Sequence, residues 1–161
     1  MKDLNTNLLS IVVSVYNEEK NLLAFFNELL LKTEKINTEI IFVNDGSYDN
    51  SLKVLIEIKN KYNNIKIINL SRNFGHEAAM LAGIDNSNAE YILCLDADLQ
   101  HPPEIIPKML DKAQKGADIV FAKRKKREDG GFIKNLLSKI FYKIINKMSP
   151  VRFEPDARIF S

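Results

Sequence analysis

The chain has 161 residues, of which 45% are hydrophobic and 27% are charged, as is usual for a soluble globular protein with one sizeable core. It contains no run of about 18 apolar residues, which excludes a membrane-spanning helix within this sequence. The net charge is only +2, but residues 121–161 hold eleven Lys and Arg against four Asp and Glu. This basic region indicates either a solvated surface or a face that meets an anionic partner.

The cysteine content and the N-terminal residues indicate in which cellular compartment the protein is expected. The single cysteine, Cys94, lies in an apolar run and predicts a buried thiol. One cysteine forms no internal disulfide, so a reducing cytoplasm is expected. The apolar residues 8–15 lack a small-residue cleavage site and run directly into polar residues, so they predict a strand rather than a signal peptide.

Short apolar runs alternate along the chain with segments of helical periodicity. Strands are predicted at residues 8–15, 39–44, 65–70, 91–95 and 117–122, and helices at 18–35, 51–62, 75–85 and 103–115. The strands show little strict alternation, as in a parallel sheet that is covered on both faces. The pattern predicts an α/β fold with a Rossmann-like, mostly parallel sheet and helices on both faces, in a single domain over residues 1–161.

The C-terminal part of the chain has a different pattern. Residues 132–148 combine an apolar stripe with lysines that lie off it, which predicts a basic amphipathic helix. This helix would either pack on its own domain or lie on a membrane surface. Residues 152–161 look like the start of another strand, and no cap or polar tail closes them. A domain truncated at its C-terminus is therefore expected.

Polar residues gather where the predicted strands end. They occupy residues 15–19, 44–51, 71–77, 96–100 and 122–128. Parallel α/β sheets bind ligands beyond the carboxyl ends of their strands. Five such ends in succession favour one shared cleft.

Two acidic motifs stand out among these polar residues. Asp45 precedes Gly46 in a turn, and Ser47 or Asp49 can cap the next helix. Such capping does not require Asp45, whose carboxylate could accept hydrogen bonds from a ribose or a base.

Asp96 and Asp98 lie two residues apart at the end of a predicted strand, so their carboxylates point the same way if the segment is extended. A nearby cation relieves their repulsion. Oxygen ligands suit Mg²⁺ or Mn²⁺, which would neutralise a diphosphate leaving group. The structural alternatives are a helix cap at Asp98 or two surface acids.

Histidines and basic residues complete the candidate set. His76 and His101 fit positioning or surface roles better than roles as ligands or bases. Lys123, Arg124 and Arg127 could clamp phosphates, or they form a solvated basic loop.

These residues together identify a resemblance. The chain resembles the family 2 inverting glycosyltransferases with the GT-A fold, and within them the polyprenyl-phosphate sugar transferases, the group of dolichyl-phosphate mannose synthase and undecaprenyl-phosphate glycosyltransferases. The matching blocks lie at residues 12–22, 42–51, 71–83, 95–107, 123–127 and 155–161. The block SRNFGHEAAMLAG (71–83) points to the lipid-phosphate subgroup.

The resemblance implies a role for each matching residue. Residues that would bind the nucleotide-sugar are Tyr16, Asn17, Glu18, Asp45, Arg72, Asp96, Ala97, Gln100, Arg124 and Arg127. Asp98, with Asp96, would hold Mg²⁺ or Mn²⁺. Asp156 stands where the family has its presumed catalytic base, and Asp98 would be the second catalytic residue. The block around Asp156 departs from the family pattern, because it lacks the glycine and has Ala157 in place of an aromatic residue.

The resemblance also implies partners and a location. A UDP- or GDP-sugar would be the donor and a polyprenyl phosphate the acceptor, in a metal-assisted transfer with inversion. The protein would lie at the inner membrane face through residues 132–148, with the full-length protein anchored in the membrane. A nucleic-acid partner is not expected, and a homo-oligomer is compatible with the sequence. The alternatives are a soluble or polysaccharide acceptor and a non-catalytic subunit that binds nucleotide-sugars.

Overall fold

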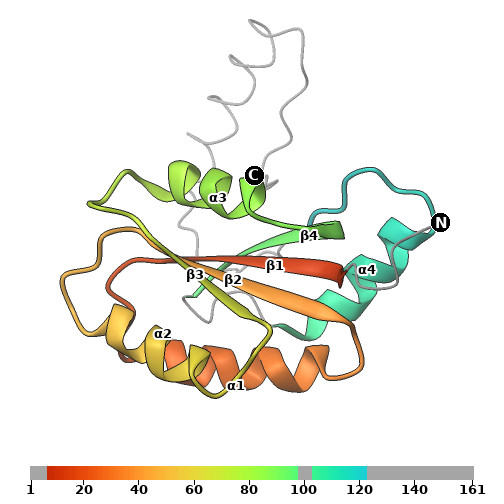
Figure 1. Ribbon diagram of the computed structural model, residues 1–161. Helices are drawn as coiled ribbons and strands as arrows, with labels where there is room; N and C mark the ends of the chain where they lie inside the picture. Colours follow the sequence, from red (N-terminus) through yellow and green to blue (C-terminus); the bar gives the residue numbers. More distant parts are fainter. Residues whose placement is uncertain (1–6, 98–102, 123–161) are drawn as a thin grey trace, which may run out of the picture. The chain divides into compact units, whose positions relative to one another are not determined.

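The fold is built on a parallel sheet. The computed structural model describes residues 7–97 and 103–122, and within them one sheet has the strand order β3-β2-β1-β4. Its strands are β1 (Asn7–Val15), β2 (Thr38–Asn44), β3 (Ile65–Asn69) and β4 (Ala89–Asp96). Every neighbouring pair is parallel. The predicted parallel sheet is therefore confirmed for these four strands (Figure 1).

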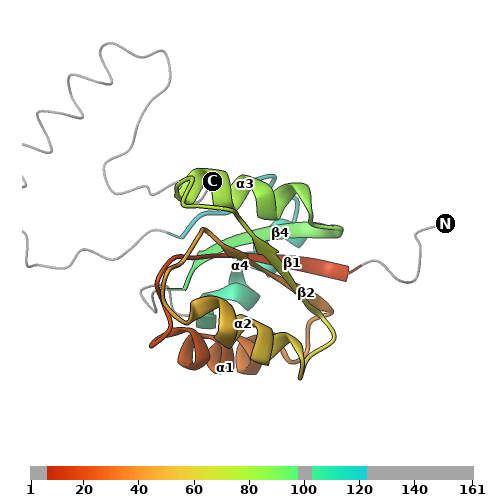
Figure 2. The same ribbon diagram turned by 60° about the vertical axis from the view of Figure 1, so that its left-hand side comes forward.

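Helices connect the strands and cover both faces of the sheet. They are α1 (Leu22–Thr33), α2 (Ser51–Lys59), α3 (His76–Asp85), the 3-10 turn η1 (Pro103–Ile105) and α4 (Ile106–Gln114). Figures 1 and 2 show α1 and α2 on one face and α3 on the other. The four predicted helices are present but shorter. Helix α1 starts at Leu22 because residues 18–21 form a turn in which the Glu18 carbonyl accepts the N–H groups of Asn21 and Leu22.

The larger part of the core lies between the sheet and α1. Leu22, Phe25, Phe26 and Leu29 are buried, and their spacing places them on one helical face. The Phe26 ring packs edge-on against Phe42 of β2, with ring centroids 6.1 Å apart. Burial of each such side chain contributes about 1.5–3 kcal/mol, so this face fixes α1 on the sheet.

On the opposite face of the sheet, one glycine allows helix α3 to pack closely. A Cβ added to Gly83 of α3 would lie 2.2 Å from Cγ1 of Val12 in β1, well inside van der Waals contact. The missing side chain lets the α3 backbone approach the sheet over Val12, Ile41 and Val43, which form a buried cluster with Ala79 and Met80. Helix α3 therefore packs directly on the sheet.

The predicted fifth strand, residues 117–122, is wrong. These residues form no strand, and Ile119 is 81% exposed. Helix α4 ends in a Schellman motif, in which the N–H of Ala117 bonds to the carbonyl of Lys112 and that of Gly116 (φ +98) to Ala113. Ala117, the first residue of the predicted strand, therefore belongs to the C-terminal cap of α4. No described strand pairs with the rest of it.

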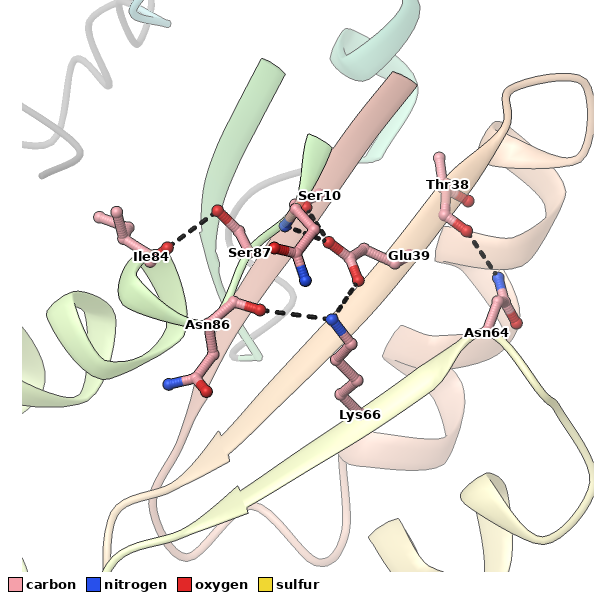
Figure 3. A network of polar contacts seen from close by, with 9 residues as sticks. Ser10, Thr38, Glu39, Asn64, Lys66, Ile84, Asn86 and Ser87 are labelled. Carbon is pink, nitrogen blue, oxygen red and sulfur yellow. Dashed lines mark hydrogen bonds and ion pairs between the residues drawn. The ribbon is translucent and has the colours of Figure 1, made fainter. Parts of the chain in front are cut away.

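A polar cluster lies at the amino ends of the strands, away from the predicted site. Figure 3 shows Glu39 of β2 between Ser10 of β1 and Lys66 of β3. The Ser10 hydroxyl and the Asn88 backbone N–H both donate to Oε1 of Glu39, and Lys66 Nζ also donates to the Asn86 carbonyl at 3.3 Å. The cluster ties three strands to the α3–β4 turn.

The described residues fall into two compact units. Residues 7–97 and 103–118 belong to one, and residues 119–122 belong to the other. Within the described ranges, none of the helices has the length and apolarity needed to span a bilayer. The predicted basic helix 132–148 and the predicted strand at 152–161 lie outside the described residues. The prediction of a single domain, truncated at its C-terminus, stays a prediction.

Candidate active site

The strand register brings the predicted polar segments to one edge of the sheet. Val15 at the end of β1 pairs with Asn44 at the end of β2, and Asn44 pairs with Asn69 of β3. Ser14 pairs with Asp96 at the end of β4. The segments that follow these four strands therefore lie at the same edge, as the sequence predicted. The fifth predicted segment, residues 122–128, follows no strand.

The loop after β1 is joined to the loop after β2 by reciprocal hydrogen bonds. The backbone N–H of Asn17 donates to the Ser47 hydroxyl at 3.0 Å, and the Tyr48 N–H donates to Oδ1 of Asn17 at 3.0 Å. Asn17 has φ +56, a left-handed conformation that Asn tolerates better than most residues. The Asn17 side chain thus serves the loop–loop contact.

Acidic side chains extend this contact. Glu19 donates its N–H to Asp49 Oδ2 at 3.1 Å, and its own Oε2 accepts from the backbone and side-chain nitrogens of Asn50 at 2.9 Å each. Burial alone would raise the pKa of Asp49, but hydrogen bonds from Ser51 and the Glu19 N–H outweigh it and lower that pKa. Asp49 also accepts the Ser51 N–H at 2.9 Å. The N-cap residue of α2 is Asn50 and not the predicted Ser47 or Asp49, so Asp49 supports the start of the helix from one position further out.

Glu18 lies at the same junction. Its backbone N–H donates to the Ser51 hydroxyl at 2.8 Å, and its Oε2 accepts from Nδ2 of Asn21 at 2.8 Å. The Glu18 backbone is thereby fixed to the start of α2. Contact of its carboxylate with a nucleotide stays a prediction.

Asp45 anchors the loop after β3. The residue is 2% exposed; its Oδ1 accepts the Phe74 N–H at 2.8 Å and its Oδ2 accepts the Gly75 N–H at 3.0 Å. Next to it, Gly46 has φ +66, and a Cβ there would lie 2.3 Å from the Arg72 carbonyl carbon. The structure thus gives Asp45 a loop-holding role that the sequence did not predict. Its contact with a ribose or base stays a prediction.

The loop held by Asp45 presents a cation and an aromatic ring. The Arg72 guanidinium lies 4.8 Å from the centroid of the Phe74 ring, within cation–π range. Both residues are exposed. Arg72 is therefore held at the strand edge where the sequence predicted a donor site.

The fourth strand ends at Asp96 beside α3. Oδ1 of Asp96 lies 3.3 Å from Nδ1 of His76, the first residue of α3. Ala97 is buried, so its side chain faces the protein. Burial raises the pKa of the Cys94 thiol, and the charge of Asp96 raises it further. Cys94 is nevertheless only half-buried, so the prediction of a buried thiol is not borne out.

Several predicted site residues lie outside the described ranges. They are Asp98, Gln100, His101, Lys123, Arg124, Arg127 and Asp156. The described residues contain no group of three or more His, Cys, Asp and Glu placed to hold a metal ion. Asp96 offers hard carboxylate oxygens at the strand edge, a donor type that fits Mg²⁺ or Mn²⁺. The metal site therefore stays a prediction that depends on Asp96 and on Asp98.

Two contacts at this edge were missed by sequence reasoning. One is the His76–Asp96 contact, and the other is the packing of Tyr16 against Tyr48, with ring centroids 6.2 Å apart and planes at 86°. The first joins the start of α3 to the end of β4, and the second joins the loops that follow β1 and β2. The only sequence signal was that each residue lay in a segment already assigned to the shared edge.

The arrangement of strands, loops and carboxylates is that of a GT-A-fold glycosyltransferase, and comparison with known proteins gives the family. The model of glycosyl transferase family 2 matches residues 10–158. The chain therefore belongs to glycosyl transferase family 2, a family of sugar-transferring enzymes.

Individual relatives agree with this assignment. The chain is 47% identical over 154 residues to the uncharacterized glycosyltransferase sll0501 of Synechocystis, covering 94% of this chain and 48% of that protein. It is 34% identical to the bactoprenol glucosyl transferase of Shigella phage SfX, covering 94% of this chain and 50% of that protein. The chain thus spans about half the length of these curated relatives.

A solved structure shows the same fold. TarS 1–349 of S. aureus, solved in complex with UDP, superimposes with a TM-score of 0.59 and is 24% identical. The match covers 77% of this chain and 37% of that chain. At this identity the likeness shows the fold, and it confirms the predicted GT-A architecture.

Proposed function

We propose that the protein transfers a sugar from a nucleoside-diphosphate sugar to a polyprenyl phosphate, with inversion at the anomeric carbon. The observation that carries the proposal is the 34% identity to a bactoprenol glucosyl transferase over 94% of the chain. Bactoprenol is a polyprenyl lipid. A soluble or polysaccharide acceptor would leave this similarity unexplained.

The geometry supports a donor site at the carboxyl edge of the sheet. Tyr16, Arg72 and Asp96 lie at or just beyond the ends of three different strands, at the same edge of the sheet. The loops that carry Tyr16 and Arg72 are fixed by the Asn17 and Asp45 side chains, and Asp96 is the last residue of β4. A preformed site loses little conformational entropy when the nucleotide binds, which suits a cleft for a flexible diphosphate sugar.

In the proposed reaction, an oxygen of the acceptor phosphate forms a bond to the anomeric carbon. The bond between that carbon and the diphosphate oxygen breaks on the opposite face, and the nucleoside diphosphate leaves with the electron pair. The acceptor oxygen is already anionic, so no proton has to be removed from it. Asp156, the presumed base, would then act mainly by orienting the acceptor.

Charge neutralisation is the main demand on the protein. A bound Mg²⁺ or Mn²⁺ would supply Lewis-acid stabilisation of the leaving diphosphate. Asp96 and Asp98 would hold it, and Gln100 would face the sugar. Arg72, Arg124 and Arg127 would carry positive charge to the phosphates.

The acceptor determines where the protein would work. A polyprenyl phosphate lies in a membrane, so we place the protein at the inner face of that membrane. Residues 132–148 would meet the anionic surface through their lysines. This placement rests on the lipid acceptor and on the sequence of that segment.

The test is donor binding followed by transfer. Calorimetric titration with UDP and with GDP, each with Mn²⁺ and with EDTA, should show one nucleotide binding in a metal-dependent way. Asp98→Ala should abolish the metal dependence. A radiolabelled sugar should then appear in the lipid fraction when undecaprenyl phosphate is supplied. Transfer to a soluble glycan but not to the lipid would contradict the proposed acceptor.

A further inference from the structure

Tyr48 is an aromatic side chain that lies outside the hydrophobic core. It is 85% exposed, the highest value among the large apolar side chains in the described part of the chain. It follows β2 by four residues, in the loop at the carboxyl edge of the sheet. An exposed ring of this size contributes almost nothing to the core, so its position calls for another explanation.

The neighbour of Tyr48 gives that explanation. Its ring packs edge-to-face against Tyr16, with centroids 6.2 Å apart and planes at 86°, and Tyr16 is itself 43% exposed. The two rings come from different loops and together form an open aromatic corner. Such a corner offers a flat base one face for stacking and one ring for contact with its edge.

The spacing of the two rings is set by the backbone. Asn17, the residue after Tyr16, accepts the Tyr48 N–H at 3.0 Å, and its own N–H donates to Ser47, the residue before Tyr48. Tyr48 thus forms one of the hydrogen bonds that join the two loops, and Tyr16 directly precedes the residue that takes part in both. Groups of the protein itself therefore hold the two rings of the corner next to each other.

We propose that Tyr48, together with Tyr16, receives the base of the donor nucleotide, and that Tyr48 contributes to base affinity and selectivity. The inference rests on the proposed function, because it assumes that a nucleotide binds at this edge. Phosphate and sugar recognition belong to other residues. The contribution of Tyr48 is therefore confined to ligands that carry a base.

The test compares Tyr48→Leu and Tyr48→Phe by calorimetry in the presence of Mn²⁺. Loss of the ring removes base–aromatic stacking, so Tyr48→Leu should weaken binding of the preferred nucleotide, UDP or GDP, about tenfold. Tyr48→Phe keeps the ring and should stay within about twofold of the wild type. Inorganic pyrophosphate, measured as a competitor of the same nucleotide, should have the same inhibition constant in all three proteins.

The substitutions leave the hydrogen bond between the loops intact, since any residue except proline keeps the backbone N–H that bonds to Asn17. Leu31→Ala is the matched control: Leu31 is also exposed, but it lies near the end of α1, towards the opposite edge of the sheet. This variant should bind like the wild type.

The outcomes separate this inference from the proposed function. A wild-type protein that binds neither UDP nor GDP would overturn both. If the wild type binds and Tyr48→Leu binds equally well, the role of Tyr48 is overturned and the proposed function stands. The same holds if Tyr48→Leu weakens nucleotide and pyrophosphate by the same factor, because that would indicate a general loop defect.

Discussion

Nζ of Lys66 lies 2.7 Å from Oε2 of Glu39, whose side chain is almost fully buried, at the amino edge of the sheet. Burial alone would raise the pKa of Glu39. The hydrogen bonds from Lys66, Ser10 and the Asn88 N–H outweigh burial and lower that pKa. The carboxylate therefore stabilises the fold in its ionised form, at the end of the sheet that faces away from the candidate site.

The first prediction concerns the dependence of stability on pH. Because the pKa of Glu39 is lower in the folded protein, its stabilisation is fully present above the ordinary value of 4.5 and is lost as the pH falls through the lowered value. Glu39→Gln should reduce the free energy of unfolding at pH 7 by about 1–3 kcal/mol. Urea unfolding at pH 7 and at acidic pH should show the difference between wild type and variant shrinking in acid.

The control for this prediction is the exposed ion pair between Asp111 and Lys115, which lie four residues apart at the end of α4. Asp111→Asn should change the free energy of unfolding by less than about 0.5 kcal/mol. A Glu39→Gln difference that is the same at both pH values would contradict the role given to the ionised carboxylate.

The second prediction concerns the anchor formed by Asp45. Asp45→Asn turns one of its two acceptor atoms into a donor that faces a backbone N–H. We expect a loss of about 1–3 kcal/mol in stability. Hydrogen exchange should become faster at the amides of Phe74 and Gly75. Asp85→Asn, at an exposed position on α3, should leave both amides unchanged.

The third prediction concerns the approach of α3 to the sheet. Gly83→Ala would place its Cβ 2.2 Å from Val12 Cγ1, so either the helix or the Val12 side chain has to shift. Overpacking costs about 1–3 kcal/mol, which exceeds the gain of about 1 kcal/mol in helix propensity. Thermal unfolding should show a lower Tm for Gly83→Ala, and Val12→Ala in the same chain should recover part of the loss. Full additivity of the two substitutions would argue against the contact.

The fourth prediction concerns the contact between His76 and Asp96. If His76 orients this carboxylate for the nucleotide, His76→Ala should weaken metal-dependent nucleotide binding several-fold. His76→Asn places an amide nitrogen near the same point and should retain most of the affinity. Calorimetry with Mn²⁺ measures both. Equal losses in the two variants would mean that His76 acts through its bulk and not through its nitrogen.

Much of the fold could be predicted because its signals are local. The runs that became β1 to β4 are apolar and β-branched, and the periodicity of residues 22–29 specifies the buried face of α1. The failure at residues 117–122 has a physical cause. Apolar composition predicts that a segment will be buried, but a strand also needs a neighbouring strand for its backbone hydrogen bonds. Gly116 instead places Ala117 in the C-terminal cap of α4.

The site was predicted less completely, because its contacts join distant parts of the chain. The sequence placed Asp45 and Asn17 at the correct edge of the sheet. It did not show which backbone N–H groups donate hydrogen bonds to their side chains. Glu39 and Lys66 lie 27 positions apart in strands that touch only after folding, and neither was singled out. The separation of two residues along the sequence does not show whether they will form such a contact.

The junction between the first two loops divides its positions into two kinds. At Asn17, Ser47 and Asp49 the side chain itself forms the bonds, so substitution would separate the loops. At position 48 the main chain forms the hydrogen bond, and the side chain is exposed and contacts the Tyr16 ring. Relatives of this protein could therefore exchange that one residue freely. Ligand preference could drift during evolution while the scaffold beneath it stays constant.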